Sequence, residues 1–481
     1  MATGCTNLPT QTPAKPAADS SENLPARWTA VPESRLTQGD VVKGNWWTAF
    51  NDANLNRAIS QAVGNNYQIA QSRAQLAQAK AQALIASASR LPAVGAGLQA
   101  DRTRQGGGDN GFSTNESYGL NLLNVSWEVD LWNRLKAQSA AANASYLASN
   151  EALRAVRQAV AAQTAKAYLA VVESRQQLGL SQRTLQVMTE TARQVGNRAD
   201  VGIGSPGDKY LSQSNRDSAK AGLAGHQEAL DRASRQLQLL MSAYPDAKVT
   251  TADTLPRLPA LPGIGIPASL LARRPDVLAA ERQLQAAGFN MLAARRALLP
   301  GISLTTGLGT ASTELKNLLD GDFSFWRLGG SLLQPVFQGG TLRANVLLNE
   351  ARQQEAANAY AQVALTAFSE VESALAARST INNRQSALCS AANAAKSAEQ
   401  ISFNRYRQGI EPYLTVLESQ RRTLDAASAC ISAQRAALDN YVALQLALGG
   451  GFEALAASAP LPQAAGQERL PVAPPRKDQA Q

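Results

Sequence analysis

Few residues of this chain have the type and spacing that catalysis requires. Glu128 and Asp130 are two residues apart, so on a β-strand their carboxylates would share one face, as an acid/base pair does. The alternative is that both lie at a strand–helix junction and face water. His226 is the only histidine of the sequence, and a histidine without cysteine neighbours does not form a typical zinc site.

The glycine pairs at 95–97 and 307–309 have the form Gly-x-Gly but do not open a helix. A phosphate-binding loop needs that helix, so these glycines indicate close packing within strands instead. Since no Ser/His/Asp arrangement is present either, we predict that the protein is not an enzyme. We expect neither a metal site nor a cofactor.

Two cysteines favour a covalent cross-link. Cys389 lies 20 residues before Gly409, and Cys430 lies 21 residues after it, on either side of a Gly-Ile-Glu-Pro turn signal. In an antiparallel helical hairpin the two side chains would be level, which favours a disulfide and an oxidising compartment such as the periplasm. The alternative is a pair of reduced, buried side chains.

The third cysteine, Cys5, follows Thr3-Gly4 and precedes a segment rich in Pro, Ser and Thr. This order is typical of the mature start of a bacterial lipoprotein, although the charged and apolar stretches of a signal peptide do not precede it. The alternative is a chance cysteine in a disordered segment. We expect residues 1–44 to be extended, with Cys5 as a candidate lipid anchor.

The composition favours long helices over a large apolar core. Aromatic residues make up 5% of the 481 residues, mean hydropathy is −0.22, and Ala, Gln and Ser are frequent. The formal charge of +9 permits an acidic partner, but the basic residues are spread beside Gln and Glu rather than clustered with aromatic residues. Nucleic acid is therefore not an expected partner.

The order of the predicted elements occurs twice, which indicates an internal duplication. Pro92 matches Pro300 and Gly202 matches Gly409, at offsets of 208 and 207 residues. The helices are expected at 52–90, 134–200, 208–243, 274–300, 341–407 and 413–448, and the strands at 92–102, 117–129, 301–311 and 323–337. The predicted division is a first repeat at 45–244, a proline-rich linker at 245–267, a second repeat at 268–450 and a disordered tail at 451–481.

The strands alternate in a way that fits a membrane. Ile302, Leu304 and Leu308 share one face, while small or polar residues occupy the other, and a slip of this phase at Leu122-Leu123 predicts a β-bulge. Four strands do not close a barrel, so several chains would have to share one, and a wide pore needs at least three. A soluble sandwich with one wet face also fits this alternation.

Six stretches together give the chain a likeness to a known family. They span about residues 46–450 and read WWTAFND (46–52), VSWEVDLWNR (125–134), RRPDVLAAERQLQAA (273–287), LLPGISL (298–304), QPVFQGGTLRA (334–344) and YRQGIEPYLTVLESQR (406–421). In type and order they resemble the TolC-type outer-membrane factors, in particular the NodT-like lipoprotein branch that serves tripartite efflux pumps. That branch supports a lipid on Cys5, although Ala2 stands where a leucine-like residue is usual.

The resemblance implies an α+β membrane protein of the bacterial outer membrane. Three protomers would share a transmembrane β-barrel, with four strands each, above a long α-helical barrel that crosses the periplasm. Such a homotrimer is a passive duct for small molecules such as antibiotics. Its partners would be a periplasmic adaptor, an inner-membrane drug/proton antiporter and outer-membrane lipid. The alternatives are the outer duct of a protein-secretion system and, from another class, a soluble helical scaffold.

The resemblance also implies a periplasmic gate near the two inter-helix turns. The matching positions are Tyr406, Leu414, Glu418, Arg421 and Asp208. The turns that would dock the adaptor contain Gly202, Gly204, Gly409 and Ile410.

This chain departs from some family members at two gate positions. Thr415 stands where they have a carboxylate, and Glu411 where they have a basic residue. The simpler interpretation of Glu418 and Arg421 is an ordinary surface pair at i, i+3.

Overall fold

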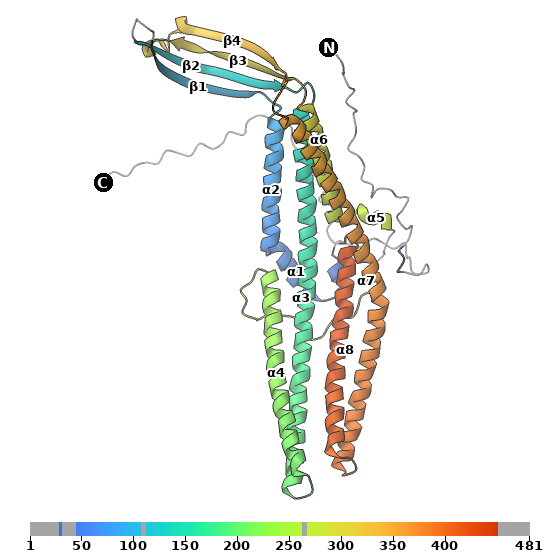
Figure 1. The fold of residues 1–481 in the computed structure, drawn as a ribbon. Helices are drawn as coiled ribbons and strands as arrows, with labels where there is room; N and C mark the ends of the chain where they lie inside the picture. Colours follow the sequence, from blue (N-terminus) through green and yellow to red (C-terminus); the bar gives the residue numbers. More distant parts are fainter. Residues whose placement is uncertain (1–27, 31–44, 107–111, 262–266, 451–481) are drawn as a thin grey trace, which may run out of the picture.

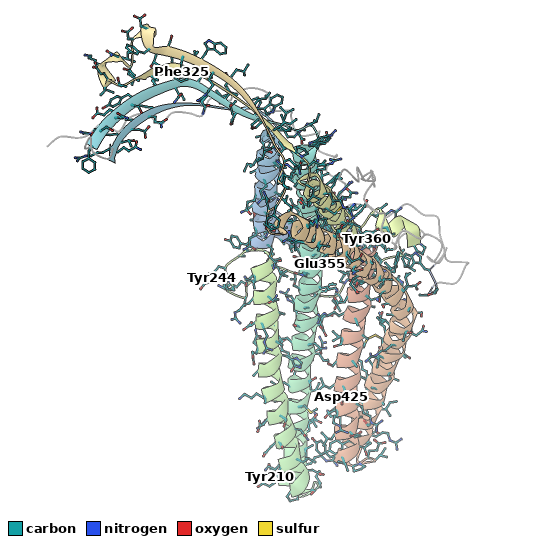
Figure 2. The ribbon with its side chains drawn as sticks, turned by 45° about the horizontal axis from the view of Figure 1, so that its top comes forward. Tyr210, Tyr244, Phe325, Glu355, Tyr360 and Asp425 are labelled. Atoms are coloured by element: carbon teal, nitrogen blue, oxygen red, sulfur yellow. A yellow bond between two sulfur atoms is a disulfide. The ribbon has the colours of Figure 1, made fainter. Side chains whose placement is uncertain are left out.

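The computed structural model describes residues 28–30, 45–106, 112–261 and 267–450. The molecule is long and narrow, with a β-sheet at one end and the turns of two helical hairpins at the other (Figure 1). In Figure 2, Phe325 lies on the sheet and Tyr210 lies near the hairpin turns. Cys5 and the tail from residue 451 lie outside the described residues, so their roles stay predictions.

The first repeat begins with two helices where the sequence predicted one over 52–90. After the 3-10 turn η4 (Trp46–Phe50), α1 spans Ala53–Asn65 and α2 spans Tyr67–Ala88. The break is at Asn66, whose backbone is extended and whose side chain accepts a hydrogen bond from the N–H of Gln68 at 2.8 Å. Such a side-chain cap favours a new helix start over continuation of the old one.

The long helices have the predicted extents. The helices α3 (Arg134–Asp200) and α7 (Thr341–Arg407) contain 67 residues each, which corresponds to about 100 Å at 1.5 Å per residue. Each pairs with a shorter helix, α4 (Pro206–Leu240) and α8 (Tyr413–Ala447) respectively. None of the described helices combines the length and the apolar character needed to cross a bilayer.

The second repeat starts with the short α5 (Pro267–Leu271) and then α6 (Pro275–Arg296). The sequence placed the end of α6 at Pro300, and the helix stops four residues earlier, at Arg296. Proline disfavours a helical conformation in the residue before it, so the chain leaves the helix through turns before Pro300 is reached.

Four antiparallel strands form one sheet in the order β1-β2-β3-β4. They are β1 (Ala93–Gly106), β2 (Phe112–Val129), β3 (Gly301–Ser312) and β4 (Ser324–Leu333), and the turns η6 (Leu315–Asn317) and η7 (Gly321–Phe323) separate the last two. The register of β2 shifts between Asn121 and Leu123, which confirms the predicted bulge. β4 ends before the predicted residue 337 because Pro335 has no N–H to donate.

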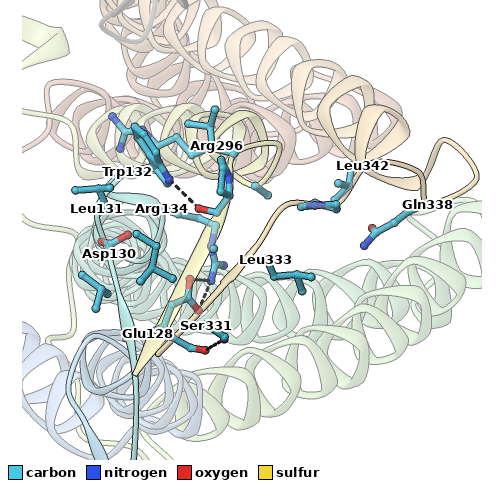
Figure 3. Close-up of a pocket in the computed structure, with 18 residues that line it drawn as sticks. Glu128, Asp130, Leu131, Trp132, Arg134, Arg296, Ser331, Leu333, Gln338 and Leu342 are labelled. Atoms are coloured by element: carbon cyan, nitrogen blue, oxygen red, sulfur yellow. Dashed lines mark hydrogen bonds and ion pairs between the residues drawn. The ribbon is translucent and has the colours of Figure 1, made fainter. Parts of the chain in front are cut away.

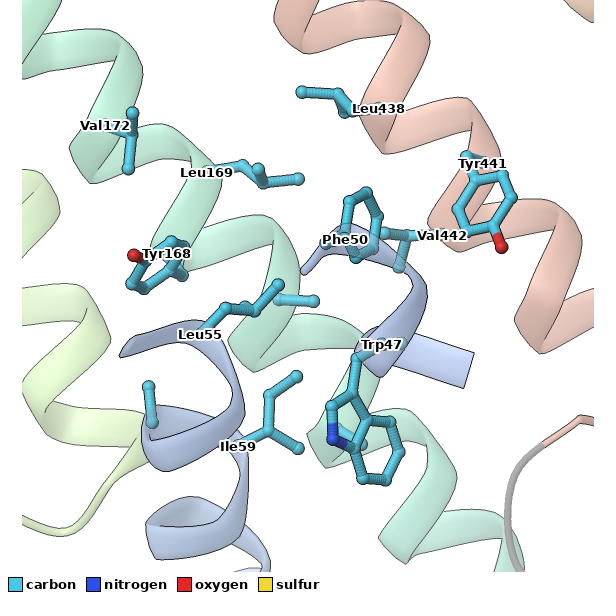
Figure 4. Close-up of a cluster of buried hydrophobic side chains, with 14 of the residues drawn as sticks. Trp47, Phe50, Leu55, Ile59, Tyr168, Leu169, Val172, Leu438, Tyr441 and Val442 are labelled. Atoms are coloured by element: carbon cyan, nitrogen blue, oxygen red, sulfur yellow. The ribbon is translucent and has the colours of Figure 1, made fainter. Parts of the chain in front are cut away.

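The largest core lies midway along the molecule, where the two repeats meet. There η4, α3 and α8 bring together Trp47, Phe50, Tyr168, Leu169 and Tyr441 (Figure 4). The Phe50 and Tyr441 rings are 5.4 Å apart and nearly perpendicular, a favoured aromatic contact. This core fixes the position of the long helices from which both hairpins extend.

A buried arginine ties the second repeat together next to this core. Arg274 is 7% exposed and donates to the carboxylates of Asp276 and Glu370, at 2.6 Å each, and to the carbonyl of Ala447 at 3.3 Å. One guanidinium group therefore joins α6, α7 and α8. Removal of either carboxylate would leave part of a buried charge without a partner.

Candidate gate at the ends of the helical hairpins

The two hairpin turns have the same backbone geometry, 207 residues apart. Gly202 and Gly409 both have a φ of +78°, in the left-handed region that glycine adopts without steric cost. The N–H of Ile203 donates to the carbonyl of Arg198 at 3.0 Å, and the N–H of Ile410 donates to that of Arg405 at 2.9 Å. These bonds close a Schellman motif at the end of each long helix.

Tyr406 lies in a small buried cluster between the hairpins rather than on the surface. Its ring is 6.0 Å from that of Tyr413, and Val195 and Val416 complete the cluster. Burial raises the pKa of Tyr406, Arg198 opposes this rise, and the charge of Asp208 adds to it. The charge of Asp208, in the first turn of α4, therefore acts on the tyrosine pair, and these two predicted gate residues interact electrostatically.

Arg198 links the hairpins, and sequence reasoning gave it no role. Its guanidinium carbon lies 5.0 Å from the centre of the Tyr406 ring, and its Nη1 donates to the Tyr406 carbonyl at 3.2 Å. Arg405, at the matching position of the second repeat, pairs with Glu411 of its own turn at 2.8 Å. The duplication contained a signal for Arg198, because Arg198 and Arg405 occupy matching positions before the two turn glycines. The structure shows that these two arginines have different partners.

The other predicted gate residues form a separate set on α8. Leu414 is 66% exposed, and Glu418 accepts from Arg422 at 2.8 Å and pairs with Arg421 at 3.0 Å. These guanidinium groups, Arg422 first, hold the pKa of Glu418 below its ordinary range. The opposite face of α8, which carries Tyr413, packs against α3.

The tips of both turns are apolar and exposed. Ile203 and Ile410 are largely open to solvent, and Gly204 packs so closely that a Cβ atom there would lie 3.0 Å from the Ala199 backbone nitrogen. A side chain at Gly204 would therefore distort the first turn. The two turns thus share their backbone at Gly202-Ile203 and Gly409-Ile410, whereas Glu411 of the second turn stands where the first turn has Gly204.

Above the tips, polar contacts and a disulfide hold the helices in register. The Gln420 side chain donates to the hydroxyl of Thr191 at 3.1 Å, in a buried contact between α8 and α3. Cys389 of α7 and Cys430 of α8 form a disulfide in the structure. The two cysteines lie opposite each other on the antiparallel helices α7 and α8, as the sequence predicts.

The residues first considered for catalysis have structural partners. Glu128 accepts from Arg134 through both oxygens, at 2.6 and 2.7 Å. Asp130 accepts from the N–H groups of Leu135 and Lys136, at 2.9 and 2.7 Å, and so caps the start of α3. In the part of the chain that the structure describes, no group of three His, Cys, Asp or Glu side chains could hold a metal ion.

Comparison with known proteins gives matches along nearly the whole chain. The model of the outer membrane efflux protein family matches residues 58–243 and 266–450, one match per repeat. Outer membrane protein OprJ of Pseudomonas aeruginosa is 33% identical over 456 residues, covering 93% of either chain. The cation efflux system protein CusC of Escherichia coli strain K12 is 30% identical over 470 residues, 93% of this chain and 97% of CusC.

Solved channels share the fold. The Campylobacter jejuni CmeC outer membrane channel matches with a TM-score of 0.83 at 25% identity, over 88% of this chain and 91% of CmeC. The open state of the Neisseria gonorrhoeae MtrE outer membrane channel matches with a TM-score of 0.79 at 29% identity, over 93% of this chain and 99% of MtrE. These matches confirm the TolC-type resemblance and the internal duplication. By both halves of its sequence and by its fold, this chain belongs to the outer membrane efflux protein family.

Proposed function

We propose that the protein is the outer-membrane duct of a tripartite efflux system and works as a homotrimer. The observation that carries this proposal is a four-stranded sheet at the end of helices about 100 Å long. Among the described strands, β1 and β4 each pair on one side only. An open strand edge in lipid leaves backbone groups without partners, at several kcal/mol each, and a barrel shared by three chains removes that cost.

The gate would form where the hairpin ends of three protomers converge. Three Leu414 side chains around the axis would make an apolar constriction, and narrow apolar constrictions exclude water. Three Glu418 carboxylates would repel one another unless Arg421 and Arg422 compensate them. The exposure of Leu414 in the single protomer supports this role, since an apolar side chain gains from such a contact.

The transported compounds and the partners follow by analogy with relatives. The names of two relatives mention different exported compounds: the toluene efflux pump outer membrane protein TtgF of Pseudomonas putida and the cation efflux system protein CusC. The duct would therefore be passive and non-enzymatic, and would serve small molecules such as antibiotics. A periplasmic adaptor would bind the two turn tips, and an inner-membrane drug/proton antiporter would supply the energy.

A lipid on Cys5 is compatible with the position of Trp28. Trp28 is buried against Phe368 of α7, with ring centres 6.3 Å apart. From Thr341, at the sheet end of α7, to Phe368 is about 40 Å at 1.5 Å per residue. The 23 residues from Cys5 to Trp28 can span up to about 80 Å, so an acyl chain on Cys5 can reach the membrane that holds the sheet.

The test is the mass of the particle extracted from membranes in mild detergent, measured by light scattering with the detergent subtracted. Three chains of 50.8 kDa give 3 × 50.8, about 152 kDa, before any lipid. A membrane-derived particle of that mass supports the shared barrel. A monomer in the soluble fraction that needs no detergent would overturn the duct and favour the helical scaffold.

A further inference from the structure

A cavity with both charged and apolar walls lies where the sheet meets the helices (Figure 3). Its volume is about 390 Å³, and its walls come from β2, β3, β4 and the ends of α3, α6 and α7. The register pairs Glu128 with Ser303, and Ser303 with Ser331, so these three side chains lie on one face of the sheet. The two serine hydroxyls are 2.7 Å apart.

This face is the polar one. The next residues in the register, Trp127 and Leu304, pair on the opposite face, and a Cβ atom at Gly330 would touch Leu304 at 3.3 Å. The inference stated below rests on the proposed function. If the sheet is part of a shared barrel, its apolar face meets lipid and the face with Glu128 lines the lumen. The cavity then opens to the interior of the duct, at the neck between strands and helices.

A carboxylate and a guanidinium group form an ion pair in this cavity. Arg134, the first residue of α3, reaches back to Glu128, and its Nη2 lies 2.6 Å from the nearer carboxylate oxygen (Figure 3). The Arg134 and Glu128 side chains are 27% and 38% exposed, so dissolved ions can approach both groups. Arg296 also lines the cavity, and its Nη1 donates to the carbonyl of Asn133 at 2.8 Å.

We infer that the Glu128–Arg134 pair is a charge-balancing site at the neck of the duct, present once in each protomer, which keeps the neck open to small solutes of either charge. The intact pair presents opposite charges close together, so its field at the lumen is weak. Removal of one partner leaves three charges of one sign around the lumen, and a ring of like charges selects the ions of opposite sign. The site therefore acts on charged small solutes and ions that pass through the neck.

A clamp that only fastens α3 to the sheet would use the same contacts. The two roles differ in what a substitution changes. Loss of a clamp lowers the melting temperature and leaves ion selectivity unchanged. Loss of one charge of a charge-balancing site shifts the ion selectivity, and the direction of this shift depends on which partner is removed.

The experiment measures the K⁺/Cl⁻ permeability ratio from reversal potentials of the purified protein in planar bilayers under a KCl gradient. We expect Glu128→Gln to shift the ratio toward Cl⁻ and Arg134→Gln to shift it toward K⁺, each by about threefold or more at low salt. The double variant should return close to wild type. Glu116→Gln is the matched control, because Glu116 pairs with Arg102 at 3.2 Å on the face that carries Leu98 and Leu120.

A second variant keeps the test valid if the pair is needed for assembly. Ser331→Asp adds a carboxylate to the same wall and leaves the Glu128–Arg134 contact intact, so it should shift the ratio toward K⁺. Normal conductance with wild-type selectivity in Glu128→Gln, Arg134→Gln and Ser331→Asp would overturn the site. Absence of conductance in the wild type would instead contradict the proposed duct.

Discussion

Single residues on α8 divide the helix into two faces with different roles. Tyr413, Val416 and Gln420 are buried, whereas Leu414 is exposed and Glu418 is partly exposed. The buried face holds the two hairpins of one protomer together. The exposed face, with Leu414 and Glu418, is available to the other protomers. Each prediction about the gate therefore depends on which face a side chain occupies.

The exposed face can be tested with Leu414→Ala and Glu418→Gln. Both changes weaken the closed arrangement that we propose, so single-channel conductance and antibiotic leak should rise several-fold. Leu239→Ala is the matched control, since Leu239 is also 66% exposed but lies on α4 far from the turn. Unchanged conductance in both gate variants would remove these residues from the gate.

The link between the hairpins can be tested with Arg198→Gln. The variant loses a hydrogen bond and a cation–π contact with Tyr406, together worth about 1–3 kcal/mol. The two hairpins should separate more easily, and open-channel events should become more frequent. Arg405→Gln serves as control because Arg405 contacts Glu411 within its own turn. Equal effects of the two substitutions would contradict a specific role of Arg198.

At the scale of elements, the turn glycines can be distinguished from a helical glycine. Gly202→Ala and Gly409→Ala place a side chain in the left-handed region and should each cost about 1–2 kcal/mol of stability. Gly222→Ala, inside α4 with open space around it, should stabilise by about 1 kcal/mol. Thermal unfolding would measure all three, and a stabilising effect at Gly202 or Gly409 would contradict the turn geometry.

The disulfide joins the two helices of one hairpin. The two cysteines are 41 residues apart, and in the chain-entropy model such a loop contributes about 4 kcal/mol. The variant Cys389→Ser/Cys430→Ser should therefore melt at a lower temperature than the wild type. A reductant should lower the melting temperature of the wild type but not that of the variant. In a Cys5→Ser background, thiol labelling of the unreduced, denatured protein should be absent. Two reactive thiols would rule out the bond.

At the scale of the whole molecule, one protomer exposes large apolar side chains along its sides. Examples on α7 are Leu347 and Leu365, and on α2 Ile85. Burial of such side chains between protomers would contribute about 25 cal/mol per Å², so much of the stability belongs to the assembly. The melting temperature in detergent should rise with protein concentration. A melting temperature independent of concentration would indicate that each protomer is stable alone.

Much of the fold follows from local sequence signals. The long helices α3 and α7 were predicted over their observed ranges because they lack proline and end at glycine turns. The break at Asn66 was missed because capping competes with helix continuation by a small free-energy difference. The early end of α6 was missed for a similar reason, since a proline restricts its neighbours without fixing the last helical residue.

Local sequence patterns are enough to predict the duplication and most of the elements, because periodicity, proline and glycine act over a few residues. The family follows from the resemblance of six stretches. The side chains that meet over long sequence separations become known only from the packing of the folded chain. Arg198 contacts Tyr406, and Arg274 contacts Glu370, over separations of 208 and 96 residues. The packing also places Glu128 with Ser303 and Ser331 on one face, through a register that includes a bulge. Such contacts depend on how helices and strands pack, and local sequence patterns do not encode that packing.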